Sequence, residues 1–170
     1  MKSPLIVDLI PRSAWCSNLR SEISSEEWTL VKQKTAQIAG HCCEFCGGKG
    51  SQWPVECHER WGYDDKTRIQ RLVGVEALCP NCHEATHLGL SELKGRSKEA
   101  RSQLMKVNSW SVNTLNQHVE EAWVTWNKRN TMTWLLDARW LLSYIPLSAQ
   151  TVDKLLQHSK GLVTRNIRDY

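Results

Sequence analysis

Residues 79–87, with the sequence Cys-Pro-Asn-Cys-His-Glu-Ala-Thr-His, decide the fold. They begin with a Cys-x-x-Cys turn, which presents two thiolates together and leaves backbone N–H groups free to donate to the sulfurs. A second turn of the same spacing occurs upstream, and 32 residues separate the inner cysteines of the two turns. Two such turns complete a tetrahedral site. The sequence therefore predicts a structural Zn²⁺ ion held by Cys43, Cys46, Cys79 and Cys82.

Other uses of the cysteines explain less of the pattern. A redox function would account for one Cys-x-x-Cys pair and leave the other unexplained. Cys42 could replace Cys43 as a ligand, but the two-residue gap would then be lost. Cys16 has no partner by spacing, so we expect it to be an ordinary buried residue.

A pair of histidines follows directly from the second turn. His83 and His87 are four residues apart and share one face of a short helix expected over 82–88, so they can grip one divalent metal ion. Upstream, residues 52–58 are expected to form a short strand that closes on Glu56-Cys57-His58-Glu59, and residues 69–78 a second strand. The predicted order is strand, loop, strand, helix, with Gly89 ending the helix.

A strand that ends in a histidine and is followed by Cys-x-x-Cys-His-x-x-x-His resembles the HNH nuclease motif, in its zinc-bound branch. The segments 53–61, 70–72 and 77–83 are similar to those of uncharacterised bacterial and phage HNH proteins, and the likeness covers roughly residues 40–137. The resemblance implies an α+β fold: a ββα-metal core stapled by the four-cysteine zinc site. An N-terminal helix and a C-terminal helical region would flank this core.

The resemblance also implies an enzyme, a metal-dependent endonuclease that hydrolyses phosphodiester bonds in DNA. Mg²⁺ or another divalent cation would contact the scissile phosphate and stabilise charge on the leaving oxygen. A histidine of the first strand would take a proton from the attacking water, and the products would carry 5′-phosphate and 3′-hydroxyl groups. The catalytic residues implied are His58, Glu59, His83 and His87.

Two registers of the first strand remain open. In one, Cys57 binds the catalytic metal with His83 and His87, and His58 is the base; a soft thiolate would favour Zn²⁺ or another transition metal over Mg²⁺. In the other, His58 completes a three-histidine metal site and Glu59 is the base. We favour His58 as the base, because an unperturbed histidine pKa of about 6.5 suits proton transfer near neutrality.

The central Asn of the HNH motif should fall near position 74 or 75, where this chain has Gly74 and Val75. Asn81 lies inside the cysteine turn, which is the wrong place. The orienting role is therefore vacant or belongs to another residue such as Gln70. This departure supports an alternative function, a catalytically inactive zinc-binding HNH-like module that binds nucleic acid or a protein partner.

Three segments are expected along the chain: an N-terminal helical segment (1–40), the zinc-bound core (41–91) and a basic, Trp-rich helical region (92–170). Ser24 and Glu27 form a capping-box pattern that opens a helix ending near Gly40. Residues 91–107 are either an exposed helix or a linker. Further helices are expected over 113–129 and from Ser148 to Gly161.

Charge is distributed unevenly over these segments. Residues 1–91 carry 10 Lys+Arg and 11 Asp+Glu (net −1), whereas residues 92–170 carry 12 and 7 (net +5). The basic half is either a solvated helical surface or a source of contacts to a polyanion. Nine tryptophans could stack on bases, but the helical spacing of Trp123 and Trp126 favours packing in a core. The candidate nucleic-acid contacts are Lys94, Arg96, Lys98 and Arg101.

The N-terminal apolar run is broken by Asp8 and bounded by prolines, so no signal peptide is indicated. No stretch approaches the roughly 20 apolar residues that a membrane span needs. We therefore expect a protein of the cytoplasm, in a bacterial cell or a phage-infected host, with DNA as its partner and no membrane contact. A protein partner remains open.

Overall fold

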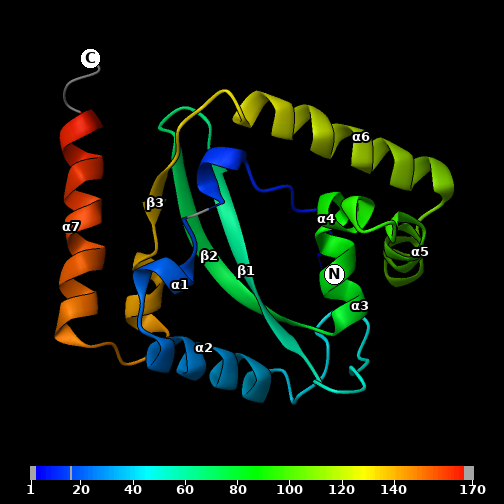
Figure 1. The fold of residues 1–170 in the computed structure, drawn as a ribbon, viewed down its shortest axis with the longest axis horizontal. Coiled ribbons are helices and arrows are strands. Elements are labelled where there is room, and N and C mark those ends of the chain that lie inside the picture. The colour runs from blue at the N-terminus through cyan, green and yellow to red at the C-terminus, as the bar shows by residue number, and fades with distance from the viewer. Residues whose placement is uncertain (1–2, 16, 167–170) are drawn as a thin grey trace.

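The computed structural model describes residues 3–15 and 17–166, so Cys16 lies outside the described residues. The chain is mixed α+β, with one three-stranded sheet and helices around it (Figure 1). In chain order the elements are η1 (Arg12–Ala14), α1 (Leu19–Glu22), α2 (Ser25–Ile38), β1 (Glu56–Asp64), β2 (Ile69–Leu78), α3 (Pro80–Thr86), α4 (Leu88–Leu93), α5 (Ser97–Asn108), α6 (Val112–Arg129), β3 (Leu135–Asp137), η2 (Arg139–Ser143) and α7 (Ala149–Asn166).

The sheet has the order β1-β2-β3, with β1 antiparallel and β3 parallel to the central strand β2. The second strand occupies the predicted residues, 69–78. The first strand does not: it runs from Glu56 to Asp64 rather than over 52–58. Pro54 lies in a closed turn, where its carbonyl accepts from Gly50 N (3.0 Å), and pairing with β2 carries β1 onward to the hairpin turn. The segment Glu56–Glu59 therefore opens β1 instead of closing it.

Helix α2 begins where the capping box predicts. Ser24 Oγ accepts from Glu27 N (3.2 Å), and the Glu27 carboxylate accepts from Ser24 N (2.8 Å). Both bonds satisfy N–H groups that a helix start leaves without an intrahelical partner. The helix then buries Trp28 and Val31 in one of the two hydrophobic cores.

The short helix after the second cysteine turn is divided in two. α3 spans Pro80–Thr86, and His87 lies at the junction with α4 (φ −89°, ψ 50°). Gly89, expected to end the helix, lies inside α4. A Cβ there would approach Leu9 Cδ2 to 3.2 Å, so the glycine permits close packing against the N-terminal segment. His87 is thus held where two helices meet.

The C-terminal region contributes more than helices. Residues 91–107 are largely helical, in α4 and α5, and α6 covers the predicted 113–129 with one added residue at its start, Val112. β3 was not expected, because three residues carry too little alternation to indicate a strand. α7 runs through Gly161, the expected stop, to Asn166.

Two hydrophobic cores hold the molecule together, and β2 contributes to both. Leu78 belongs to the first core, with the N-terminal segment and helices α3 to α6. Leu72 belongs to the second, with α1, α2, η2 and α7. The three predicted segments thus share the two cores, and the second and third segments also share the sheet. Among the described residues, no helix combines the length and the apolar character that crossing a membrane requires.

Candidate metal centres

The four cysteines of the two turns come together. The sulfurs of Cys43, Cys46, Cys79 and Cys82 all lie within 4.8 Å of one another, and the Cys46–Cys79 distance is 3.6 Å. Tetrahedral zinc with Zn–S bonds of about 2.3 Å requires neighbouring sulfurs about 3.8 Å apart. The cluster could therefore hold a metal ion such as zinc with little rearrangement.

Hydrogen bonds dock the first turn against the end of β2. Glu44 N donates to Ala77 O (2.9 Å), and Ala77 N donates to the Glu44 carboxylate (2.6 Å). Within the turn Gly48 N donates to Cys46 Sγ (3.3 Å), and a Cβ at Gly48 would crowd that sulfur. Gln103 of α5 donates to Cys82 Sγ (3.1 Å). Cys46 and Cys82 thus each accept a hydrogen bond from an N–H group of the surrounding structure.

Two thiols of the cluster are shifted in opposite directions: the pKa of Cys43 is lowered, and that of Cys82 is raised. Hydrogen bonding from the Cys82 thiol, together with backbone amides of the turn, lowers the pKa of Cys43 to about 4. Cys42 lies outside the cluster, and its thiol contacts Gly40 O (3.4 Å). Cys43, rather than Cys42, is therefore the residue that the fold brings to the other three sulfurs.

A second cluster lies beside the first and contains the three histidines singled out in the sequence. One ring nitrogen each of His58, His83 and His87 lies within 4.8 Å of the others. The ring centroids are 4.8–5.3 Å apart and the rings meet edge to face. β1 supplies the first histidine, α3 the second and the α3–α4 junction the third. The two clusters are linked through the adjacent residues Cys82 and His83.

No protein-family model, curated protein or solved structure matches this chain.

Burial favours the neutral form of His58 and His87. His58 is only 5 % exposed, and burial together with the neighbouring imidazoles lowers its pKa to about 3. The same causes lower the pKa of His87 to about 4. Neutral imidazole is the form that binds metal, so the cluster is ready for a cation near neutral pH.

Two carboxylates that the sequence reasoning missed complete the surroundings of the histidines. Glu56 lies two residues before His58 on β1 and bonds to Nδ1 of His83. Strand periodicity could have found it, since alternate residues share a face. A carboxylate on one ring nitrogen orients a histidine and leaves the other nitrogen for a metal ion.

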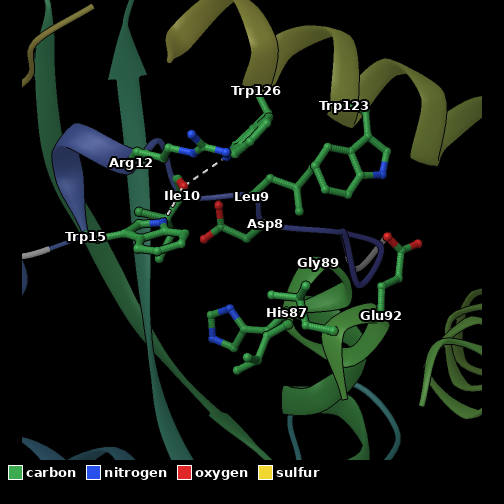
Figure 2. Close-up of a pocket in the computed structure, with 12 residues that line it drawn as sticks. Asp8, Leu9, Ile10, Arg12, Trp15, His87, Gly89, Glu92, Trp123 and Trp126 are labelled. Atoms are coloured by element: carbon green, nitrogen blue, oxygen red, sulfur yellow. Dashed lines mark hydrogen bonds between the residues drawn. The ribbon is translucent and has the colours of Figure 1, made fainter. Parts of the chain in front are cut away.

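The second carboxylate, Asp8, comes from the N-terminal segment. Its Oδ2 lies 3.8 Å from His58 Nε2, and burial raises the pKa of Asp8 to about 6. Three long-range contacts place the segment: Asp8 N donates to Thr86 O (2.8 Å), Val7 N to His118 Nε2 (3.0 Å) and Leu5 N to Asn108 Oδ1 (2.8 Å). No sequence spacing links Asp8 to the histidines. Figure 2 shows its carboxylate on the same side of the segment as the His87 ring.

Cys57 and Glu59 do not join the histidines. They flank His58 on a strand, so their side chains point to the opposite face of the sheet. Cys57 Sγ contacts Thr35 Oγ1 of α2 (3.6 Å), and burial raises the pKa of this thiol to about 11. The Glu59 carboxylate accepts from Leu19 N (3.3 Å) and Trp61 Nε1 (3.2 Å). The expectations of Cys57 as a metal ligand and Glu59 as the base are therefore corrected.

Gln70 is likewise absent from the histidine cluster. It pairs with Tyr63 at the hairpin end of β2, whereas His58 pairs with Glu76 near the other end. The Gln70 amide lies 3.5 Å from Ser17 O. At the position expected for the central Asn, Gly74 lies against the Arg60 side chain.

Of the four residues predicted to contact nucleic acid, the two arginines bond to carboxylates of the protein and the two lysines are exposed. Arg96 donates a bidentate pair of hydrogen bonds to the Glu84 carboxylate (2.6 and 3.0 Å). Arg101 lies 3.5 Å from Glu92. Lys94 and Lys98 are exposed at the end of α4 and the start of α5. The lysines therefore have more freedom to meet a phosphate than the arginines.

Proposed function

We propose that this chain is an HNH-type, metal-dependent endonuclease that hydrolyses phosphodiester bonds in DNA to give 5′-phosphate and 3′-hydroxyl ends. The single observation that carries the proposal is the convergence of His58, His83 and His87 from a strand and the following helix. Their adjacency to a four-cysteine cluster is the arrangement implied by the zinc-bound HNH motif. The ββα-metal core would be β1, β2 and α3, built on a structural zinc ion.

The three imidazoles would hold the catalytic cation. Bound there, a divalent ion would polarise the phosphodiester and stabilise charge on the leaving oxygen. Imidazole ligands suit zinc, nickel and other transition ions better than Mg²⁺, which prefers oxygen ligands. We therefore expect Mn²⁺, Ni²⁺ or Zn²⁺ to support cleavage at lower concentrations than Mg²⁺.

The remaining groups would position water and ligands. Glu56 would orient the His83 ring through its Nδ1. Asp8, 3.8 Å from His58 and facing a cavity, is the carboxylate best placed to accept a proton from an attacking water. In this assignment His58 is a ligand rather than the base, because its ring meets the rings of His83 and His87.

The test is nicking of supercoiled plasmid with Mg²⁺, Mn²⁺, Ni²⁺ or Zn²⁺. His58→Ala is expected to abolish nicking and to lower affinity for the catalytic cation. Cys57→Ala is the matched control, since it alters the adjacent side chain on the opposite face and is expected to retain activity. Folded wild-type protein that binds the cation but cleaves no DNA with any of the four metals would overturn the proposal.

A second candidate function is a zinc-binding HNH-like module without catalytic activity, which binds nucleic acid or a protein partner. The observation that favours it is the replacement of the central Asn by Gly74 and Val75, together with the engagement of Glu59 and Gln70 elsewhere. Gel-shift binding of DNA by wild-type protein, without cleavage under any of the four metal conditions, would identify this function.

A further inference from the structure

A cavity of about 650 Å³ opens directly beside the histidines (Figure 2). It lies between the N-terminal segment, α4 and α6. The residues that line it are mostly apolar or aromatic, with a few charged groups at intervals: Asp8, Leu9, Ile10, Arg12, Trp15, His87, Gly89, Leu90, Glu92, Leu93, Trp123 and Trp126. Asp8 and His87 line this cavity and also belong to the surroundings of the candidate metal centre, so the cavity is continuous with that centre.

Two tryptophans of this cavity are held rigidly by one acceptor. Trp15 Nε1 and Trp126 Nε1 both donate to Ile10 O, at 2.9 and 3.0 Å, as the dashed lines in Figure 2 show. Trp123 supports Trp126 edge to face, with ring centroids 5.2 Å apart. Trp15 is nonetheless 60 % exposed. A large aromatic side chain that is oriented yet uncovered is a surface prepared for a flat ligand.

The charged groups of the cavity suit a base better than a phosphate. Asp8 and Glu92 would repel a phosphate but can accept hydrogen bonds from the amino and imino groups of a nucleobase. Arg12 lies 5.6 Å from the ring of Trp126, at the rim, where it can contact a phosphate outside the cavity. The chemistry thus changes from aromatic and acceptor-rich inside to basic at the edge.

A second cavity of about 430 Å³ adjoins the histidines at His83 and is also lined by Glu56. It also contains Trp53, which is exposed, and the basic residues Arg20 and Lys32. Two cavities that each contain tryptophan and at least one basic side chain therefore adjoin the candidate metal centre, one at His87 and the other at His83. That repetition is expected where a nucleic-acid strand crosses a site.

We propose that the 650 Å³ cavity binds an unpaired nucleobase next to the scissile phosphate, so that the substrate is single-stranded or locally unpaired DNA. The inference rests on the proposed function and specifies its substrate class. Bases inside a duplex are stacked and paired, and their faces cannot reach Trp15. A strand with its base on Trp15 would carry the neighbouring phosphate toward the three histidines.

The test measures binding and does not depend on cleavage. A fluorescein-labelled, single-stranded oligodeoxynucleotide of about 12 residues, with phosphorothioate linkages to block hydrolysis, is titrated with full-length zinc-loaded protein. Trp15→Ala is expected to weaken binding about 5- to 100-fold, and Trp15→Phe to retain most of it. Val124→Ala, at an exposed apolar residue on α6 away from the cavity, is the matched control, and thermal melting verifies folding of every variant.

Two further probes identify the occupant. A set of oligonucleotides with one abasic residue at successive positions should contain one position where the loss of affinity matches that of Trp15→Ala. The fully paired duplex should bind more weakly than the single strand. Equal binding by wild type and Trp15→Ala, no sensitivity to any abasic position, or tighter binding of the duplex would each overturn the inference.

The outcomes separate this inference from the proposed function. If binding depends on Trp15 but plasmid is not nicked, the base-binding cavity is supported and the nuclease proposal is rejected. If the protein nicks plasmid but Trp15→Ala binds the oligonucleotide as tightly as wild type, the nuclease proposal is supported and the base-binding cavity is rejected. Failure to bind any oligonucleotide would overturn the inference and direct attention to an apolar peptide as the occupant.

Discussion

His58 Nε2 of β1 faces Asp8 Oδ2 of the N-terminal segment at a distance of 3.8 Å. The segment is held there by backbone bonds to α3 and by side chains of α5 and α6. A carboxylate from outside the strand-strand-helix unit thus lies next to the histidine cluster.

The first prediction concerns Asp8. At saturating metal, Asp8→Asn should lower the kcat of nicking about 100-fold, since a positioned proton acceptor contributes on that order or more. Thermal stability should not fall, because burial already disfavours the charged carboxylate. Glu120→Gln, at an exposed carboxylate on α6 that does not line the cavity, is the control and should keep its kcat. Unchanged kcat in Asp8→Asn would assign the proton transfer to another group.

The second prediction distinguishes the neighbouring cysteines. Cys43→Ser should remove one equivalent of bound zinc and lower the melting temperature, because ligand loss uncouples metal binding from folding. Cys42→Ser should keep the zinc content and the melting temperature. Elemental analysis and differential scanning calorimetry check both. Loss of zinc from Cys42→Ser alone would mean that the first turn uses the other cysteine.

The third prediction concerns the basic residues near α4 and α5. Lys98→Ala should weaken DNA binding and reduce the slope of log K against log salt by about one, as expected for the loss of one phosphate contact. Arg96→Ala should instead act mainly on folding stability, because its guanidinium is bonded to Glu84. Titrations at several salt concentrations measure the slopes. The reverse assignment would show that Arg96 leaves Glu84 for the nucleic acid.

The fourth prediction is a pH dependence of stability from Asp137, which is 4 % exposed. Bonds from Arg139, which outweigh the effect of burial, lower the pKa of Asp137 to about 2, and Arg71 adds a further bond. Because the folded pKa lies below the unfolded one, the stabilisation is present above about pH 4 and is lost as pH falls toward 2. The contribution at neutral pH is about 1–2 kcal/mol, allowing for the exposed arginines.

Asp137→Asn should therefore destabilise the protein at pH 7 by about 1–2 kcal/mol, and the deficit relative to wild type should shrink near pH 3. Urea unfolding at the two pH values measures the difference between wild type and Asp137→Asn. A loss of bound metal in acid would be common to both proteins and would cancel. Asp153→Asn, at an exposed carboxylate on α7, is the control. A deficit of equal size at both pH values would contradict the assignment.

Local patterns in the sequence were sufficient to predict several parts of the structure. The two Cys-x-x-Cys turns, the capping box at Ser24 and the strand over 69–78 are local features, and each is present as predicted. The helical neighbours His83 and His87 and the strand residue His58 also come together as the order of elements suggested. In each case the deciding information lies within a few residues or in a repeated spacing.

The tertiary structure decided the surroundings of the histidines and the third strand. These features depend on which face or edge of a strand meets which distant segment. Neighbouring residues of β1 point to opposite faces of the sheet, so His58 faces His83 while Cys57 contacts α2 and Glu59 contacts α1. The sequence left open which of these residues would face the histidines. Asp8 reaches His58 only through contacts with helices far along the chain. β3 forms because β2 offers an unpaired edge, not because Leu135–Asp137 has a strong strand pattern. The sequence alone thus indicated the two candidate metal clusters except for the choice between Cys57 and His58. Packing between distant segments decided that choice and the neighbours of both clusters.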